Sequence, residues 1–300
     1  MRIHLPLFLV LWPALGGCAS VPGSTFEQKQ KGLVLILPGI EGRSRFNVDI
    51  AGGLRLGGVE AAIAIHDWTT RAGSLGWYLH LADERRNRTE AIRLARRIVK
   101  YKKTFPDRPV FLIAHSGGAG IALMTLERLP HFAPAEAVVL LAGAVSPERN
   151  LNKALSRTRR GIWNFYSSRD VGFLVLGTSL FGTIDREHGP SAGAVGFETP
   201  KRLTERAAGR YQQKLHQIPY HAEMAKLGHL GGHGGWTSPK FVARWIAPIL
   251  LDQPLPADSP VEPAVGDPSD GTDHAEAPRS GPCGDAEPHE SPSIASASAW

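Results

Sequence analysis

The chain has 300 residues, of which 42% are hydrophobic, and its formal net charge is +6. A chain of this length can bury one sizeable core or two small ones. The charge is uneven, because residues 251–300 hold ten acidic residues and one arginine, a balance of −9 that leaves about +15 on the rest. No nucleic-acid motif or aromatic-studded basic loop accompanies this charge, so we expect no nucleic-acid partner. Much of it lies in Glu84–Lys103, where the pattern favours one amphipathic helix with a solvated face.

The first 17 residues have the pattern of a targeting segment. Arg2 precedes the apolar stretch LPLFLVLWPALG, which is too short for a comfortable membrane span. The sequence Leu15–Cys18 (LGGC) then resembles the lipobox of bacterial lipoproteins, which implies that Cys18 is acylated and becomes the first mature residue. The alternative is a plain secretory signal with a chance cysteine. Residues 18–31 are polar and short, and we interpret them as a tether.

The lipobox resemblance also carries an expected location. It implies a bacterial cell envelope, with the protein held on a membrane through the acyl chains on Cys18. Ala19 and Ser20 follow the cysteine, with no aspartate, and in Gram-negative lipoproteins that pattern favours the outer membrane. The location therefore depends on whether the host has an outer membrane.

Between Gly32 and about Leu250, short apolar runs alternate with helical patterns. The predicted strands are Leu33–Leu37, Ala61–Ile65, Val110–Ala114, Ala137–Leu141, Ile162–Ser167 and a less apolar sixth, Lys214–Tyr220. The main helical patterns are Arg88–Tyr101, Gly120–Leu129 and Lys240–Leu250. This alternation predicts an α/β domain over residues 32–250, with a mostly parallel sheet and helices on both faces. Residues 251–300 are rich in Pro, Ser, Ala and acid, without periodicity, and are expected to be disordered.

The stretch Phe111–Leu123, FLIAHSGGAGIAL, joins a buried strand to a helix with almost no room to turn. Such a reversal places the residue at its apex in strained backbone and requires small neighbours. Ser116 would be that apex, with Ala114 two residues before it and Gly118 two residues after it. A strand, a sharp turn bearing serine and a helix are the context of a nucleophile elbow.

At this point the chain resembles the α/β-hydrolase superfamily, over roughly Gly32 to Leu250. In that family a serine comes first, an acid follows a later strand, and a histidine lies near the end. Ser116, Asp170 and His233 occur in that order, which implies a nucleophile, an orienting acid and a general base. The resemblance also implies an oxyanion hole made by the backbone N–H groups of Gly117 and Ile40.

Several alternatives compete for these roles. Asp185 is a rival for the acid and His229 is a rival for the base. We favour Asp170 because it directly follows a strand, and His233 because it lies close to the anchored start of the last helix, where Ser238 is the expected N-cap. His115 is interpreted as structural. No phosphate-binding glycine motif and no rigid metal-ligand pattern occurs, so no metal or organic cofactor is expected.

The sequence therefore predicts a membrane-anchored serine hydrolase of the α/β-hydrolase type. Its partner would be a small-molecule or lipid-like ester, and less often a thioester or amide. The short connection Ser146–Gly161 leaves room for one small helix, and Leu174–Phe197 is a second candidate for covering the site. The alternative from another class is a binding or scaffolding lipoprotein that keeps the fold without turnover.

Overall fold

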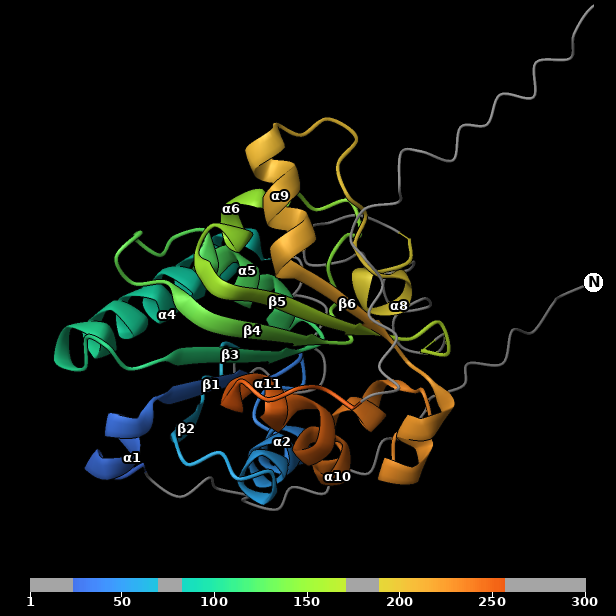
Figure 1. Cartoon of the computed structure of the whole chain (residues 1–300), viewed down its shortest axis with the longest axis horizontal. Coiled ribbons are helices and arrows are strands. Elements are labelled where there is room, and N and C mark those ends of the chain that lie inside the picture. The colour runs from blue at the N-terminus through green and yellow to red at the C-terminus, as the bar shows by residue number, and fades with distance from the viewer. Residues whose placement is uncertain (1–23, 70–82, 171–188, 257–300) are drawn as a thin grey trace, which may run out of the picture. The chain divides into compact units, whose positions relative to one another are not determined.

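The computed structural model describes residues 24–69, 83–170 and 189–256. In these ranges six strands form one sheet in the order β2-β1-β3-β4-β5-β6, and every neighbouring pair is parallel (Figure 1). The strands are β1 Leu33–Leu37, β2 Ala62–Ile65, β3 Val110–His115, β4 Ala135–Leu141, β5 Thr158–Tyr166 and β6 Leu215–Pro219. The predicted class, a parallel sheet with helices on both faces, is confirmed by this topology.

Each predicted strand overlaps one strand of the structure, and the largest difference is at the start of β5. The strand begins at Thr158, four residues before the apolar run IWNFY, because Arg159 and Arg160 continue it as polar residues. Arg160 is held by specific contacts: its Nη1 donates to Asp252 Oδ1 at 2.8 Å and its Nη2 to the carbonyl of Ile249 at 2.6 Å. An apolar pattern cannot reveal a strand residue that is stabilised by contacts with a segment so distant in sequence.

Helices cover both faces of the sheet (Figure 1). One face carries α4 Glu84–Thr104, α5 Gly118–Leu126, α6 Asn152–Leu155 and α9 Glu205–Lys214. The other carries α2 Arg45–Leu56 and the last helical segment, which comprises α10 Pro239–Phe241, a π-helical turn Val242–Ile246 and α11 Ala247–Leu251. The π-helical turn comes just before Pro248, whose missing N–H removes one helical hydrogen bond. Two short elements complete the helices named here, α1 Phe26–Lys31 and α8 Ala192–Val195.

The alternation of side chains along each strand divides the core in two. In β1, Leu35 packs with α4 and α5 on one face, while Val34 and Ile36 pack with α2 and the last helical segment on the other. All five residues of β1 are buried, as expected for a strand of a parallel sheet that is covered on both sides. The sheet is therefore a rigid platform, and the loops after its strands carry the polar groups.

Part of the expected tether is folded. Residues 26–31 form α1, whose N-cap Thr25 and Gln28 make a capping box. The helix is tied to the body because the hydroxyl of Tyr101 donates to the carbonyl of Lys29 at 2.6 Å. The polar composition of this segment conceals these tertiary contacts, which is why the sequence alone indicates a tether.

Several predictions fall on residues outside the described ranges. They concern the targeting segment, Cys18, most of the covering segment Leu174–Phe197, Asp185 and nearly all of the tail. The short connection after β4 contains α6, in agreement with the prediction of one small helix there. No helix in the described parts of the chain is both long enough and apolar enough to cross a membrane.

Candidate active site

Ser116 lies at the apex of a tight turn between β3 and α5. Its φ angle is +53°, in the left-handed region that residues other than glycine rarely adopt. Backbone hydrogen bonds hold the turn on both sides: Ser116 N–H donates to the carbonyl of Leu141 at 2.9 Å, and its own carbonyl accepts from Ala119 and Ala144 at 3.1 Å each. These hydrogen bonds tie the turn to the end of β4. They hold Ser116 in a strained backbone conformation that costs about 1–3 kcal/mol.

Two glycines allow other backbone segments to come close to this turn. A Cβ added at Gly118 would lie 2.5 Å from the carbonyl oxygen of Pro38, which follows β1. A Cβ added at Gly39 would lie 3.0 Å from the Cβ of Ser116 and 2.2 Å from a carboxylate oxygen of Glu41. Any larger residue at either position would push the Pro38–Gly39 loop away from the serine. The loop that follows β1 is therefore in direct contact with the elbow.

The acid and the histidine favoured from sequence form a close pair. Asp170 is in the turn after β5, where its N–H donates to the carbonyl of Ser167 at 3.1 Å. The Nδ1–H of His233 donates to Asp170 Oδ2 at 2.7 Å, which is a short, charge-assisted distance. Because Nδ1 carries that proton, the neutral imidazole keeps Nε2 as an acceptor. The two residues are 63 positions apart in sequence and meet because both loops lie at the carboxyl end of the sheet.

Burial sets the acid–base properties of this pair. The side chain of Asp170 is 2% exposed and that of His233 is 11% exposed. Burial lowers the pKa of His233, and the hydrogen bond that His233 donates to Asp170 offsets part of that decrease. The charge of His115 also lowers this pKa, while Glu41 raises it. His233 is therefore held mainly neutral at physiological pH, the form in which an imidazole accepts a proton.

His115 lies between Ser116 and the Asp170–His233 pair. It directly precedes the serine, it is fully buried, and its ring lies 4.7 Å from the ring of His233, measured between centroids. Its Nε2–H donates to the backbone carbonyl of His233 at 3.2 Å. These contacts agree with the interpretation of His115 as a structural residue, and they show that it holds the loop that carries His233.

Glu41 is a further residue of this site that the sequence did not single out. Its Oε1 accepts a hydrogen bond from the N–H of Gly39 at 3.2 Å and lies 3.8 Å from Nδ1 of His115. Partial burial raises the pKa of this carboxyl, but the neighbouring His115 ring, and more weakly His233, bring it below its usual value. Glu41 thus links the loop after β1 to the histidines. Its place in PGIEG, directly after the expected oxyanion loop, was the one signal available in the sequence.

His229, the rival base, lies in a different environment. Its ring is fully buried and packs on Trp236 at 3.9 Å between centroids and on Phe241 at 5.2 Å. Its Nδ1 accepts a hydrogen bond from Gly231 N–H at 3.2 Å, and burial lowers its pKa to about 4. A residue enclosed in this way is part of the core between the last helix and the sheet.

The structure brings Asp170 and His233 into contact and places the other described candidates on loops at the same edge of the sheet. Ser116 and the Asp170–His233 pair are at one edge of the sheet, with Gly117 at the N-cap of α5 and Ile40 directly after Gly39. Asp185 lies outside the described residues, so its rivalry with Asp170 stays open. Among the described residues, no group of three or more His, Cys, Asp or Glu is arranged to hold a metal ion. Ser238 occupies the predicted N-cap, but its hydroxyl donates to the carbonyl of Leu227 at 2.6 Å and does not cap the helix.

The parallel sheet, the strained serine turn after β3 and the acid–histidine pair after later strands define an α/β-hydrolase type of fold. No family model matches the chain, and no curated protein matches its sequence. Similar solved structures include esterase PE8, with 18% identity, 45% of this chain and 67% of that chain covered, and a TM-score of 0.34. A predicted CIB-like hydrolase from Thermoplasma acidophilum has 12% identity and a TM-score of 0.40, and the match covers 74% of this chain and 87% of that one. A poly(3-hydroxybutyrate) depolymerase, LpqC, from Bordetella parapertussis has 14% identity and a TM-score of 0.45, and the match covers 76% of this chain and 81% of that one.

Proposed function

We propose that this protein is a serine hydrolase that cleaves a carboxylic ester through an acyl-enzyme. The observation that carries the proposal is the 2.7 Å hydrogen bond between His233 and Asp170, at the sheet edge where Ser116 occupies a strained turn. A serine hydroxyl is a weak nucleophile until a neighbouring base takes its proton. In this proposal His233 is the base, with Nε2 as the proton acceptor because Nδ1 faces Asp170, and Asp170 is the acid that stabilises its protonated form.

In the first half of the reaction, Ser116 Oγ attacks the ester carbonyl carbon while Nε2 of His233 takes the hydroxyl proton. The negative charge that develops on the carbonyl oxygen is stabilised by the backbone N–H groups of Gly117 and Ile40. Gly117 precedes the first turn of α5, where amide groups have no partner within the helix and the helix dipole favours negative charge. The tetrahedral intermediate then releases the alcohol, which takes its proton from His233.

In the second half, water attacks the acyl-enzyme and His233 takes the proton of that water. Collapse of the second tetrahedral intermediate releases the acid and returns the proton to Ser116 Oγ. These steps use only side chains and backbone amides of this chain. The substrate class is a small-molecule or lipid-like ester, and a thioester or an amide is a less favourable variant of the same chemistry.

The experiment that tests the proposal is labelling with a fluorophosphonate probe, which reacts only with an activated serine. The wild-type protein should label, and Ser116→Ala should abolish the label and lower kcat for a nitrophenyl ester by roughly a thousandfold or more. His229→Asn is a matched control, because this histidine lies outside the pair, and it should still label. A folded wild-type protein that never labels would instead favour the non-catalytic binding or scaffolding lipoprotein.

We also propose that the protein is anchored to a bacterial membrane through acylation of Cys18, with the outer membrane favoured where the host has one. The support is the Leu-Gly-Gly-Cys junction after a short apolar stretch. Metabolic palmitate labelling should follow Cys18 and disappear in Cys18→Ser. Persistence of the label in that variant, or recovery of the wild-type protein entirely in the soluble fraction, would contradict the proposal.

A further inference from the structure

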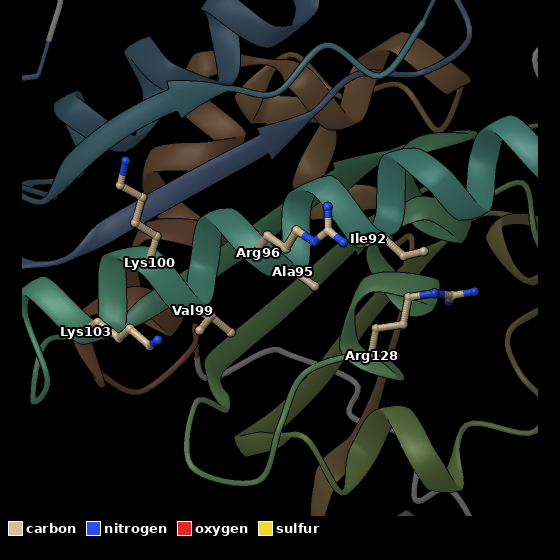
Figure 2. Close-up of a pocket in the computed structure, with 7 residues that line it drawn as sticks. All are labelled: Ile92, Ala95, Arg96, Val99, Lys100, Lys103 and Arg128. Carbon is tan, nitrogen blue, oxygen red and sulfur yellow. The ribbon is translucent and has the colours of Figure 1, made fainter.

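The outer surface of α4 has a hollow, and none of the residues that line it is a candidate residue of the active site. It has a volume of about 490 Å³ and is formed by one stripe of α4 together with Arg128, in the turn that follows α5 (Figure 2). Its lining residues are Ile92, Ala95, Arg96, Val99, Lys100, Lys103 and Arg128. We call this surface the α4 groove. Four of its seven lining residues are cations and none is acidic.

The cations of the α4 groove differ from other cations on the same helix. Arg88 pairs with Glu84, and Arg93 pairs with Glu90 at 2.6 Å. None of the four groove cations has an ion pair with any residue in the part of the chain that the structure describes. Arg128 lies in the turn after α5, and its Nη1 donates to the carbonyl of Met124 in that helix. This partner is uncharged, so the guanidinium has no counter-ion among the described residues.

The spacing of these cations works against the stability of the helix. Arg96 and Lys100 are four residues apart, and Lys103 follows three residues later, so like charges are neighbours on one face. Like charges at this spacing destabilise a helix. An anion placed over the stripe would remove this repulsion. The charge pattern thus favours a negatively charged partner over plain solvent.

The apolar residues in the α4 groove narrow the choice of partner. Ile92 is 39% exposed and Val99 is half-buried, and both lie between the cationic side chains (Figure 2). A surface with cations and apolar side chains interleaved matches the boundary of a bilayer, where phosphates and glycerol or acyl carbons are side by side. Nucleic acid would instead favour a long phosphate track with stacking aromatic side chains, and no aromatic residue lines the groove.

We propose that the α4 groove docks on a membrane surface that contains anionic phospholipid, with the lipid phosphates bound by its four cations, Arg96, Lys100, Lys103 and Arg128. The inference does not depend on the proposed hydrolase activity. Its position agrees with the proposed anchor, because α1 packs beside the end of α4, with Phe26 and Phe105 at 5.7 Å between ring centroids. Phe26 itself is 65% exposed. From Cys18 to the start of the described chain at Ser24 an extended segment spans at most roughly 20 Å.

The test uses the mature chain, residues 18–300, carrying Cys18→Ser, so that neither the apolar targeting segment nor an acyl chain contributes to binding. Co-sedimentation with phosphatidylcholine vesicles is compared with and without phosphatidylglycerol. We expect binding only when phosphatidylglycerol is present, and weaker binding at higher salt. Adding Arg96→Ala, Lys100→Ala and Lys103→Ala should weaken the partition coefficient by about a hundredfold, since each cation near such a surface contributes roughly fivefold.

The matched control is Lys201→Ala, Arg202→Ala and Arg206→Ala, a triple change in the loop before α9 and its first turn that removes the same charge. These cations also have no ion pair within the described residues, and they do not line the groove. The control should weaken vesicle binding by less than fivefold. Both triple variants should keep the thermal midpoint and the fluorophosphonate label. A protein that fails to label yet binds vesicles as expected would overturn the hydrolase and leave the docking surface intact.

Four outcomes would overturn the inference. One is equal binding to vesicles with and without phosphatidylglycerol, and another is an equal loss in the two triple variants, which would indicate net charge alone. The third is complete displacement of the protein from the vesicles by soluble glycerol phosphate at the same concentration as the phosphatidylglycerol, which would indicate a site for a free phosphate ester. Binding to duplex DNA that depends on the groove cations, without binding to vesicles, would also reject the lipid surface.

Discussion

Two histidines four residues apart on the loop before the last helix have opposite environments. His233 donates to a buried carboxylate and contacts a second histidine, so its ring is held by polar groups. His229 is enclosed by aromatic rings, and only one of its nitrogens has a hydrogen-bond partner in the described structure. Burial lowers the pKa of both residues, but only His233 has an acid that offsets the decrease. Burial alone therefore does not make a histidine a base, because a base also needs a partner that stabilises its protonated form.

The largest expected effect separates the two histidines directly. If the proposed mechanism holds, His233→Ala should lower kcat by about 10⁵- to 10⁶-fold, as loss of the base does in well-studied serine hydrolases, because Ser116 then has no proton acceptor. His229→Asn should lower kcat by less than about threefold, on the general scale of changes away from reacting groups. Steady-state hydrolysis of a nitrophenyl ester measures both. The reverse ranking would move the base to His229.

The next effect concerns the acid behind His233. Asp170→Asn should lower kcat by about 10⁴-fold with little change in KM, since an amide no longer stabilises the imidazolium and favours the wrong tautomer. The thermal midpoint serves as a control for folding. Near wild-type turnover in Asp170→Asn would show that a different acid has this role, and the same replacement at Asp185 would then test the remaining candidate.

A smaller effect tests whether Glu41 positions the site through hydrogen bonding or through charge. Glu41→Gln keeps an oxygen that can accept from Gly39 N–H but removes the charge, whereas Glu41→Ala removes both. We expect Glu41→Ala to lower kcat by about tenfold because the loop of Ile40 is then less well held. Glu41→Gln should recover most of that loss.

The pH profile gives a second reading of Glu41. The acid limb of kcat/KM in the wild type should fall below pH 6.5, because burial lowers the pKa of His233. The charge of Glu41 raises that pKa, so Glu41→Gln should move the limb to still lower pH. His115 and Asp170 are the other ionisable groups that act on His233, and both remain in this variant. An unchanged limb together with an unchanged rate in Glu41→Ala would show that Glu41 has no part in the site.

The smallest expected effect on activity is that of replacing His229, and this residue should instead affect how the free energy of unfolding depends on pH. Its pKa of about 4 in the folded state is below the unfolded value near 6.5, so the unfolded chain binds the extra proton first as pH falls. This contribution to stability is fully present above pH 6.5 and is lost as pH falls towards 4, by about 3 kcal/mol.

His229→Asn keeps an acceptor near the N–H of Gly231 but does not titrate. It should lower the free energy of unfolding at pH 8 by about 1–2 kcal/mol, because ring packing is lost. It should also flatten the decline in stability between pH 6.5 and 4. Urea denaturation at several pH values measures both quantities, and His66, which also has a lowered pKa of about 4, remains as an internal reference. A decline as steep as in the wild type would assign the pH dependence to other groups.

Much of the fold could be predicted from the sequence because it rests on local patterns. Six apolar runs of strand length predict six strands, and the small residues around Ser116 predict the turn between β3 and α5. The order of Ser116, Asp170 and His233 indicates which loops to compare, since loops after parallel strands meet at one edge of the sheet. These are properties of spacing and residue type, which are fully present in a linear chain.

The sequence by itself thus determined the parallel α/β architecture, the strained serine turn and the short set of candidate acids and bases. Only the tertiary structure decided that Asp170 and His233 are in contact, that His229 is enclosed by Trp236, and that Glu41 lies beside His115. It also decided that residues 26–31 fold as α1 and that three cations of α4 border a groove with Arg128. The physical reason is that hydrogen-bond geometry, burial and charge pairing depend on distances across the fold. A pattern along the chain specifies the elements, but not which side chains meet when those elements pack.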